Sequence, residues 1–205
     1  HLKAQAGVNI TASHNPREYN GYKAYWEDGA QVLAPHDKGI IDEVNKVKVE
    51  DVKFEGNKAL IEIIGEEIDK IYLDKVKTIS IDPQVIKNQH DLKIVYTPLH
   101  GAGRVIIPRA LASWGFDNVH CVKEQMVKDG NFPTVDRPNP EIAEALTLGL
   151  RDAKALDADI LMASDPDADR VGMACKNCDG EWVLINGNQT CLIFLWYIIT
   201  NRQAV

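Results

Sequence analysis

The sequence predicts an α/β fold, in which a mixed and mainly parallel β-sheet is flanked by helices. Short apolar runs at residues 93–97, 119–122 and 159–163 are typical of buried strands. Segments with apolar residues at helical spacing separate these runs, and strands that alternate with helices are typical of parallel sheets. Ligands are therefore expected at the carboxyl ends of the strands, where polar loops follow the apolar runs.

Length and composition exclude several classes of protein. The 205 residues suffice for one or two domains with a buried core, and 45% apolar and 26% charged residues are ordinary globular values. The formal charge of −7 argues against a nucleic-acid partner. The apolar segment 191–199 is shorter than the roughly 20 residues that cross a bilayer, so no membrane partner is expected. Four irregularly spaced cysteines favour reduced thiols and a cytoplasmic protein.

The N-terminal region is expected to hold a strand, a hairpin and a helix. Residues 8–11 form an apolar run that predicts a short buried strand. An Asp-Gly pair between the runs 22–26 and 31–33 predicts a hairpin. Asp37 can cap a helix that continues to about residue 46, because apolar residues recur on one of its faces.

A charged stretch without periodicity at residues 46–57 marks a candidate domain boundary. Apolar residues at helical spacing then predict a long amphipathic helix over 58–77. A second helix is expected over 104–114, ended by Gly115.

The C-terminal half is expected to contain one more helix and a hairpin. The helix starts at an Asn-Pro-Glu sequence, which suits the first turn, and runs over 139–154. After the strand at 159–163, the runs 171–176 and 181–184 predict a hairpin around a turn that contains Asp-Gly.

A serine loop follows the first strand. Ser13 lies in the polar segment Thr-Ala-Ser-His-Asn-Pro, as expected of a nucleophile that a strand delivers onto a loop. A serine hydroxyl is a weak nucleophile and needs a base, a charge or a metal. His14 and Asn15 can donate hydrogen bonds to a phosphate, and Lys23 follows ten residues after the serine. We therefore interpret the segment as a candidate nucleophile loop.

A carboxylate loop follows the strand at 159–163. Asp165, Asp167 and Asp169 are spaced by two, so in an extended loop all three can face one way. Three crowded carboxylates repel one another and are tolerated when a divalent cation neutralises them, and such oxygen ligands select Mg²⁺, Mn²⁺ or Ca²⁺. An EF-hand is excluded, because Arg170 stands where its glycine is needed and Lys176 where its glutamate is needed.

Two other interpretations of this loop remain open. In a haloacid-dehalogenase-like aspartyl phosphotransferase, Asp165 would be the nucleophile and Asp167 the acid, and the serine segment would have no function. In a non-catalytic metal-binding module, the serine segment would serve only the fold. In the interpretation that we favour, the two loops meet and a cation lies against a phosphorylated Ser13.

Several motifs together resemble the α-D-phosphohexomutase superfamily, most of all its phosphoglucomutase and phosphopentomutase branch. The likeness covers nearly the whole chain. In chain order the motifs are TASHNP, NGYK, TPLHGAG, DGNFP, PNPE, DPDADR and INGNQ.

The resemblance implies an enzyme that interconverts sugar 1-phosphates and 6-phosphates, with glucose as the first candidate. Ser13 would be a phosphoserine that gives its phosphoryl group to the sugar phosphate. A hexose 1,6-bisphosphate would be the intermediate and activator, and the serine would recover a phosphoryl group from its other position. One Mg²⁺ would be bound by Asp165, Asp167 and Asp169 and by an oxygen of the phosphorylated serine.

Further roles also rest on the resemblance. Lys23 matches a family lysine assigned to general acid–base catalysis. Arg170 matches an arginine close to the transferred phosphate. His14 would orient the serine loop, and His100 is expected near the site without an assigned role.

The resemblance further implies a division of the chain into parts of domains. Residues 1–56 would be the C-terminal part of domain I, 57–185 domain II, and 186–205 the start of domain III. The parts of the family that grip the substrate would lie outside this chain, so we expect no mutase turnover from it alone. Mannose, glucosamine and pentose substrates therefore stay open beside glucose. We also expect the helix at 192–199 to expose an apolar stripe or to pack against a second copy.

Overall fold

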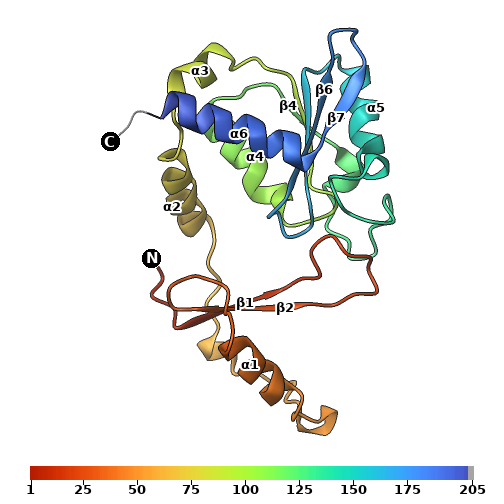
Figure 1. Cartoon of the computed structure of the whole chain (residues 1–205). Coiled ribbons are helices and arrows are strands. Elements are labelled where there is room, and N and C mark those ends of the chain that lie inside the picture. Colours follow the sequence, from red (N-terminus) through yellow and green to blue (C-terminus); the bar gives the residue numbers. More distant parts are fainter. Residues whose placement is uncertain (203–205) are drawn as a thin grey trace. The chain divides into compact units, whose positions relative to one another are not determined.

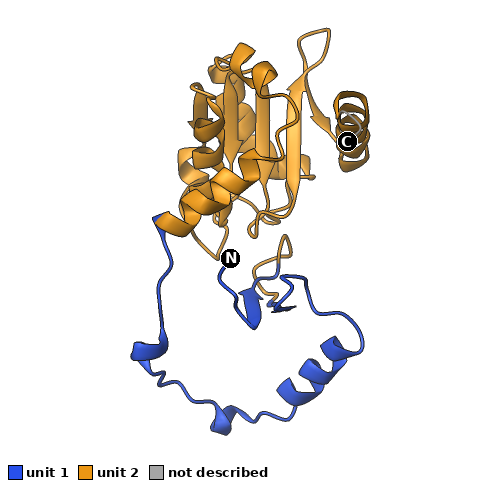
Figure 2. Ribbon diagram, turned by 90° about the vertical axis from the view of Figure 1, so that its left-hand side faces the viewer, with its two compact units in different colours: residues 1–12, 20–66 blue, residues 13–19, 67–205 orange. Residues whose placement is uncertain are grey.

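The structure is a computed structural model that describes residues 1–202. The chain divides into two compact units (Figure 2). The first comprises residues 1–12 and 20–66, and the second comprises residues 13–19 and the chain from Glu67 onward. The serine loop thus belongs to the same unit as the carboxylate loop.

The first unit holds a two-stranded antiparallel sheet. Strand β1 (Ala6–Ile10) pairs with β2 (Tyr22–Trp26). The strand that the sequence predicts is present, but the expectation that it is buried is wrong: Val8 is 54% and Ile10 65% exposed. Two strands alone form too small a layer to cover such side chains. The expected hairpin forms in a short version: Tyr25 and Gln31 make an antiparallel bridge, and the N–H of Val32 donates to the carbonyl of Ala24 at 2.9 Å.

The rest of the first unit is mostly irregular. Helix α1 (His36–Val44) forms near its predicted place, and a 3₁₀ turn, η1 (Val49–Asp51), follows in the charged stretch. The prediction of one helix over 58–77 is wrong in its first half. A 3₁₀ turn, η2 (Lys58–Leu60), leads into extended chain, and the helix α2 starts only at Glu66 and ends at Lys77. Isoleucines and the helix-breaking Gly65 occupy the extended part, which disfavours a helix without packing partners.

The second unit is built on a five-stranded mixed sheet in the order β4-β3-β5-β6-β7 (Figure 1). Strand β3 (Ile94–Thr97) lies parallel to both β4 (Val119–Cys121) and β5 (Ile160–Ser164). Strands β6 (Val171–Lys176) and β7 (Trp182–Ile185) continue the sheet in antiparallel pairing. The α/β class that the sequence predicts is confirmed.

Helices α4 (Gly103–Trp114) and α5 (Thr147–Ala155) cover opposite faces of this sheet. A Cβ atom on Gly149 of α5 would overlap the side chain of Leu161, and one on Gly103 of α4 would overlap the hydroxyl of Tyr96. Leu161 is in register with Val95, the neighbour of Tyr96, and successive residues of a strand point to opposite faces. The main buried cluster lies on the α5 face, with Val95, Leu161 and Ala174 at its centre.

The helix that the sequence predicts from residue 139 begins later. Only a 3₁₀ turn, η4 (Ala143–Leu146), precedes α5. The side chain of Asn139 does accept a hydrogen bond from the N–H of Glu141 at 3.0 Å, but it caps an isolated turn. Pro140 packs so closely on β6 that a Cβ atom on Gly172 would overlap its carbonyl group. This packing fixes the chain where the helix would otherwise start.

Three further elements complete the second unit. Two short ones are α3 (Pro83–Asn88), which we did not predict, and the 3₁₀ turn η3 (Lys123–Gln125). The long helix α6 (Gly187–Asn201) starts with a capping box, in which the Asn186 side chain accepts from the N–H of Gln189 and its own N–H is bonded in return. Its apolar side chains are largely exposed, Leu192 and Trp196 among them, as expected of the predicted stripe. None of the helices in residues 1–202 could span a membrane.

Candidate active site

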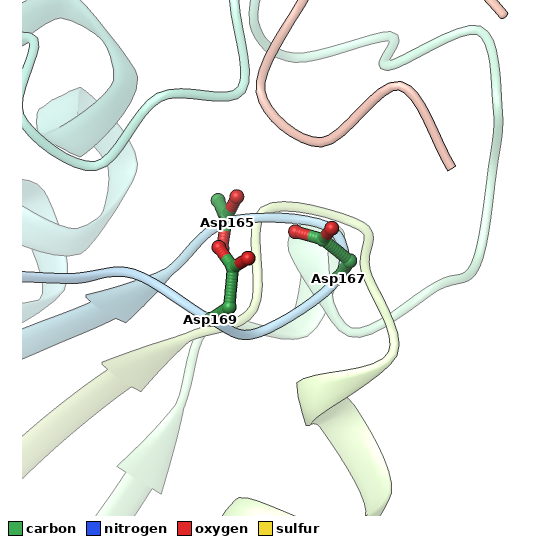
Figure 3. A group of neighbouring side chains, drawn as sticks. All are labelled: Asp165, Asp167 and Asp169. Atoms are coloured by element: carbon green, nitrogen blue, oxygen red, sulfur yellow. The ribbon is translucent and has the colours of Figure 1, made fainter. Parts of the chain in front are cut away.

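The three aspartates converge at the carboxyl end of β5. Each of Asp165, Asp167 and Asp169 offers an oxygen, and these oxygens all lie within 4.8 Å of one another (Figure 3). The loop is a turn rather than the extended segment that we expected. The N–H of Ala168, which has a left-handed φ of 61°, donates to the Asp165 carbonyl at 3.0 Å. In this turn the three carboxylates come together.

Asp165 is fully buried at the base of this turn. The pKa of its carboxyl group is raised from 3.8 to about 6, mainly by burial and next by the neighbouring carboxyl group of Asp167. The hydroxyl of Ser13 and the backbone N–H of Arg170 act in the opposite direction, because they donate hydrogen bonds to the carboxylate. Negative charge is therefore costly at this point unless a cation accompanies it.

The nucleophile candidate lies directly against the buried carboxylate. The Oγ atom of Ser13 donates a hydrogen bond to Oδ2 of Asp165 at 2.8 Å, although 152 positions separate the two residues. Ser13 has a left-handed φ of 56°, which costs a non-glycine residue roughly 1–2 kcal/mol. Strain of this kind concentrates at functional sites. Nδ1 of His14 lies 3.2 Å from the serine oxygen.

The donor set fits a magnesium ion. Six oxygen ligands at about 2.1 Å from Mg²⁺ lie about 3 Å apart when adjacent and about 4 Å apart when opposite. The oxygens of Asp165, Asp167 and Asp169 all lie within 4.8 Å of one another, so small side-chain movements would bring them to these spacings. All of these ligand atoms are oxygen, the type that Mg²⁺ prefers.

Lys23 and Arg170, the other two predicted site residues, lie on different elements. Lys23 lies half-buried on β2, opposite Asn9, in the first unit. Arg170 is exposed at the end of the carboxylate turn, and its backbone N–H donates to Oδ1 of Asp165 at 3.0 Å. The roles proposed for both side chains stay predictions.

The loop between β3 and α4 touches the carboxylate turn, a contact that the sequence did not reveal. The N–H of Ala102 donates to the carbonyl of Pro166 at 2.8 Å. A Cβ atom on Gly101 would overlap the backbone of Pro166. Sequence reasoning placed His100 at a strand end near the site but missed the buried Gln125, which no motif marks, and gave no role to Pro166 of the DPDADR motif. The glycine between His100 and Ala102 was the available signal of a close backbone approach.

A cavity of about 450 Å³ adjoins the serine loop. Pro16, Arg17 and Glu18 line one side, and residues 131–133 and 135–137 contribute the other. Its volume lies in the range of small-molecule sites, which is roughly 300–1,000 Å³.

Comparison with known proteins identifies the family. Residues 70–180 match the family model described as phosphoglucomutase/phosphomannomutase, alpha/beta/alpha domain II. The chain belongs to this family. Residues 1–51 match the domain I model of the same phosphoglucomutase/phosphomannomutase family. The resemblance read from the motifs is thereby confirmed, while the predicted domain boundaries at residues 56 and 185 stay predictions.

Individual relatives are similar over nearly the whole chain. A phosphoribomutase of Saccharomyces cerevisiae is 39% identical over 212 residues, which cover 96% of this chain and 34% of the relative. A phosphoglucomutase of Staphylococcus epidermidis is 35% identical over 211 residues, covering 100% of this chain and 38% of the relative.

Structural similarity points the same way. A crystal structure from Thermus thermophilus, provisionally named a phosphomannomutase, has a TM-score of 0.77 and 26% identity, and covers 98% of this chain and 42% of that protein. This family member thus spans between about a third and two fifths of the length of these relatives.

Proposed function

We propose that this chain carries the nucleophile and the metal site of a phosphohexomutase that interconverts sugar 1-phosphates and 6-phosphates. The observation that carries the proposal is the hydrogen bond of 2.8 Å between Ser13 and Asp165, which joins the serine loop to the three clustered carboxylates. Membership of the phosphoglucomutase/phosphomannomutase family supports it.

The proposed reaction is a pair of phosphoryl transfers through Ser13. A hydroxyl oxygen of the sugar phosphate attacks the phosphorus atom of phosphorylated Ser13, the bond between phosphorus and the serine oxygen breaks, and a hexose 1,6-bisphosphate forms. The sugar hydroxyl loses a proton and the serine oxygen gains one. After the bisphosphate turns over, the reverse transfer returns a phosphoryl group from the other position to the serine. Lys23 is the proposed acid–base group for these protons.

The charged groups of the site suit this reaction. Phosphoryl transfer is catalysed mainly by positioning and by neutralisation of charge on the transferred group. Ser13, Asp165, Asp167 and Asp169 would hold one Mg²⁺, which when bound neutralises charge on the phosphoryl oxygens. Arg170 would contact the same phosphate.

His14 is proposed to orient the serine loop, because its Nδ1 atom lies 3.2 Å from the Ser13 oxygen. Substitution of this histidine should therefore impair transfer less than loss of the serine, which removes the acceptor atom itself.

Glucose is the first candidate sugar, and a phosphoglucomutase is among the similar proteins. A pentose phosphate is the second candidate, because a phosphoribomutase and a human phosphopentomutase are 39% and 36% identical to this chain. We further propose a cytoplasmic enzyme, which the four free cysteines support.

Family membership and geometry both argue against Asp165 as the nucleophile. This carboxylate is fully buried and already accepts hydrogen bonds from Ser13 and from the backbone of Arg170. A group without access to the substrate cannot attack it, so the aspartyl phosphotransferase is abandoned. The non-catalytic metal-binding module is kept as an outcome of the experiment.

Phosphosite mapping tests the proposal directly. The chain is first treated with phosphatase, then incubated with Mg²⁺ and glucose 1,6-bisphosphate, and analysed by intact mass and peptide mapping. We expect one phosphoryl group on Ser13, lost in Ser13→Ala and in the presence of EDTA. We expect labelling without sustained mutase turnover. An unlabelled Ser13 in a chain that binds Mg²⁺ would favour the non-catalytic module.

A further inference from the structure

His100 is a buried polar residue outside the carboxylate cluster. It is 2% exposed, and both of its ring nitrogens are engaged. Nδ1 lies 2.8 Å from the carbonyl oxygen of Val127, and Nε2 lies 2.8 Å from the hydroxyl of Thr134. His100 and its neighbour Leu99 both have left-handed backbones, with φ of 66° and 47°. Two consecutive non-glycine residues in this conformation need strong external support.

The hydrogen bonds around His100 fix one arrangement of protons. A carbonyl oxygen can only accept, so Nδ1 carries the proton and donates to Val127. In the neutral ring, Nε2 then accepts from the hydroxyl of Thr134. The Thr134 oxygen in turn accepts from the side-chain amide of Gln125 at 3.0 Å.

The chain of bonds ends at β3. The Gln125 carbonyl oxygen accepts from the hydroxyl of Thr97 at 2.6 Å, and the Thr97 oxygen accepts from the N–H of Leu99 at 3.1 Å. These hydrogen bonds hold the loop after β3 at both Leu99 and His100.

His100 lies in the loop between β3 and α4, and this loop contacts the carboxylate turn. The N–H of Gly101 donates to the carbonyl of Pro98 at 2.8 Å, which closes a tight turn. This turn places Gly101 against the backbone of Pro166 and the N–H of Ala102 at 2.8 Å from its carbonyl oxygen. Pro166 lies between two of the three carboxylates. A shift of His100 therefore moves the segment that Pro166 packs on.

We propose that His100 is a positioning residue of the metal site: its imidazole, held by Val127 and Thr134, fixes the 98–103 loop so that Gly101 and Ala102 set the conformation of the turn that carries Asp165, Asp167 and Asp169. The proposal rests on the metal-binding role proposed above for these carboxylates. It assigns no contact with substrate to the histidine, which separates it from a catalytic role.

Two measurements on the whole chain test the proposal, and one of them needs no metal. In hydrogen exchange with EDTA, the amides of Ala102 and Ala168 should exchange at least fivefold faster in His100→Ala than in the wild type. In a Mn²⁺ titration followed by electron paramagnetic resonance, the same substitution should weaken binding about tenfold, the size of effect usual for groups that support metal ligands. His120→Ala is the matched control, because His120 bonds Asp152 on α5 and should change neither quantity.

Three more variants separate positioning from general destabilisation. His100→Asn keeps a donor for Val127 and should recover part of the affinity for Mn²⁺. Gly101→Ala pushes directly on Pro166 and should weaken binding as much as His100→Ala does, with the histidine intact. If His100→Ala does not fold, Thr134→Val, on an exposed residue, removes the hydrogen bonds to His100 and from Gln125 and should weaken binding about threefold.

The outcomes distinguish the two proposals. A folded His100→Ala that exchanges Ala168 at the wild-type rate and binds Mn²⁺ within twofold of the wild type would overturn the positioning role. A wild-type chain that binds no Mn²⁺ would count against the proposed function instead, and the exchange rates would still decide whether His100 holds the turn.

Discussion

The two units of this chain bury their apolar residues to very different extents. Among the described residues, Val32 is the one buried apolar side chain of the first unit, whereas the second unit has a continuous core around Val95 and Leu161. The buried carboxylate Asp165 belongs to the well-packed unit, and Lys23 belongs to the other. The carboxylates proposed to bind the metal thus belong to a unit with a buried core of its own, whereas Lys23 belongs to a unit that buries little apolar surface.

The largest expected effect comes from the core of the second unit. Leu161→Ala should lower the free energy of unfolding by about 3 kcal/mol, because it leaves a cavity beneath α5. Leu60→Ala in the first unit is the matched control: this leucine is 83% exposed, and its loss should cost less than about 0.5 kcal/mol. Urea unfolding measures both. Equal losses of unfolding free energy in the two variants would show that Leu60 is buried in a core of the first unit.

A smaller effect should come from the charge of Asp165. Its folded-state pKa of about 6 lies above its ordinary value of 3.8, so the protonated group stabilises the fold below pH 4, and this contribution is lost as the pH rises through 6. Without metal, Asp165→Asn should therefore be more stable than the wild type at pH 7.5, by up to about 2 kcal/mol. At pH 4 the variant and the wild type should have similar free energies of unfolding, apart from effects of the substitution that do not depend on pH.

Urea unfolding in EDTA at the two pH values measures this difference. Asp179→Asn, in the exposed turn between β6 and β7, serves as the control and should show no such pH dependence. A stability difference for Asp165→Asn that is the same at both pH values would contradict the assignment.

A third expected effect concerns the end of α4. Gly115 ends this helix with a left-handed φ of 102°, so Gly115→Ala should destabilise the second unit by about 1 kcal/mol. Gly39→Ala lies inside α1 of the first unit, where alanine favours a helix, and should be neutral or slightly stabilising. Thermal unfolding of the two variants tests the pair. The expectation fails if Gly115→Ala unfolds at the wild-type temperature.

The smallest effect on stability should come from the exposed face of α6. We propose that the chain self-associates through this helix at high concentration, because its leucines and Trp196 are exposed together. Trp196→Glu should lower the sedimentation coefficient toward that of a monomer and change the unfolding free energy by less than about 0.5 kcal/mol. Thr200→Glu on the same helix is the control. A wild-type chain that sediments as a monomer at all concentrations would end the proposal.

The sequence allowed prediction where local chemistry decides the structure. Gly115 ends a helix because its left-handed backbone is accessible to glycine, and the apolar run at 159–163 forms the strand β5. The place of Asp165, Asp167 and Asp169 at a strand end was predictable, whereas the turn that brings them together was not.

Prediction failed where contacts between residues far apart in the sequence decide the local structure. The helix expected from residue 139 is displaced by the contact of Pro140 with Gly172 on β6, which no local pattern shows. The helix expected from residue 58 lacks packing partners over its first turns, so its periodicity alone does not fold it. The support that His100 gives to the carboxylate turn was invisible for the same reason, since its partners Val127 and Thr134 lie about thirty positions away.

The carboxylate turn joins two strands that are direct neighbours in the sheet. Ser164 of β5 is in register with Val171 of β6, so six residues, 165–170, span one antiparallel strand pair. The two ends of this segment are held by one pair of hydrogen-bonded strands. Residues 165–170 could therefore replace the turn of another antiparallel hairpin, because its two strands would hold the ends in a similar way. We expect a graft of these six residues to need two further components, a glycine-bearing turn opposite Pro166 and a serine that bonds Asp165. The three carboxylates proposed to bind the metal thus lie on one short segment with two outside contacts.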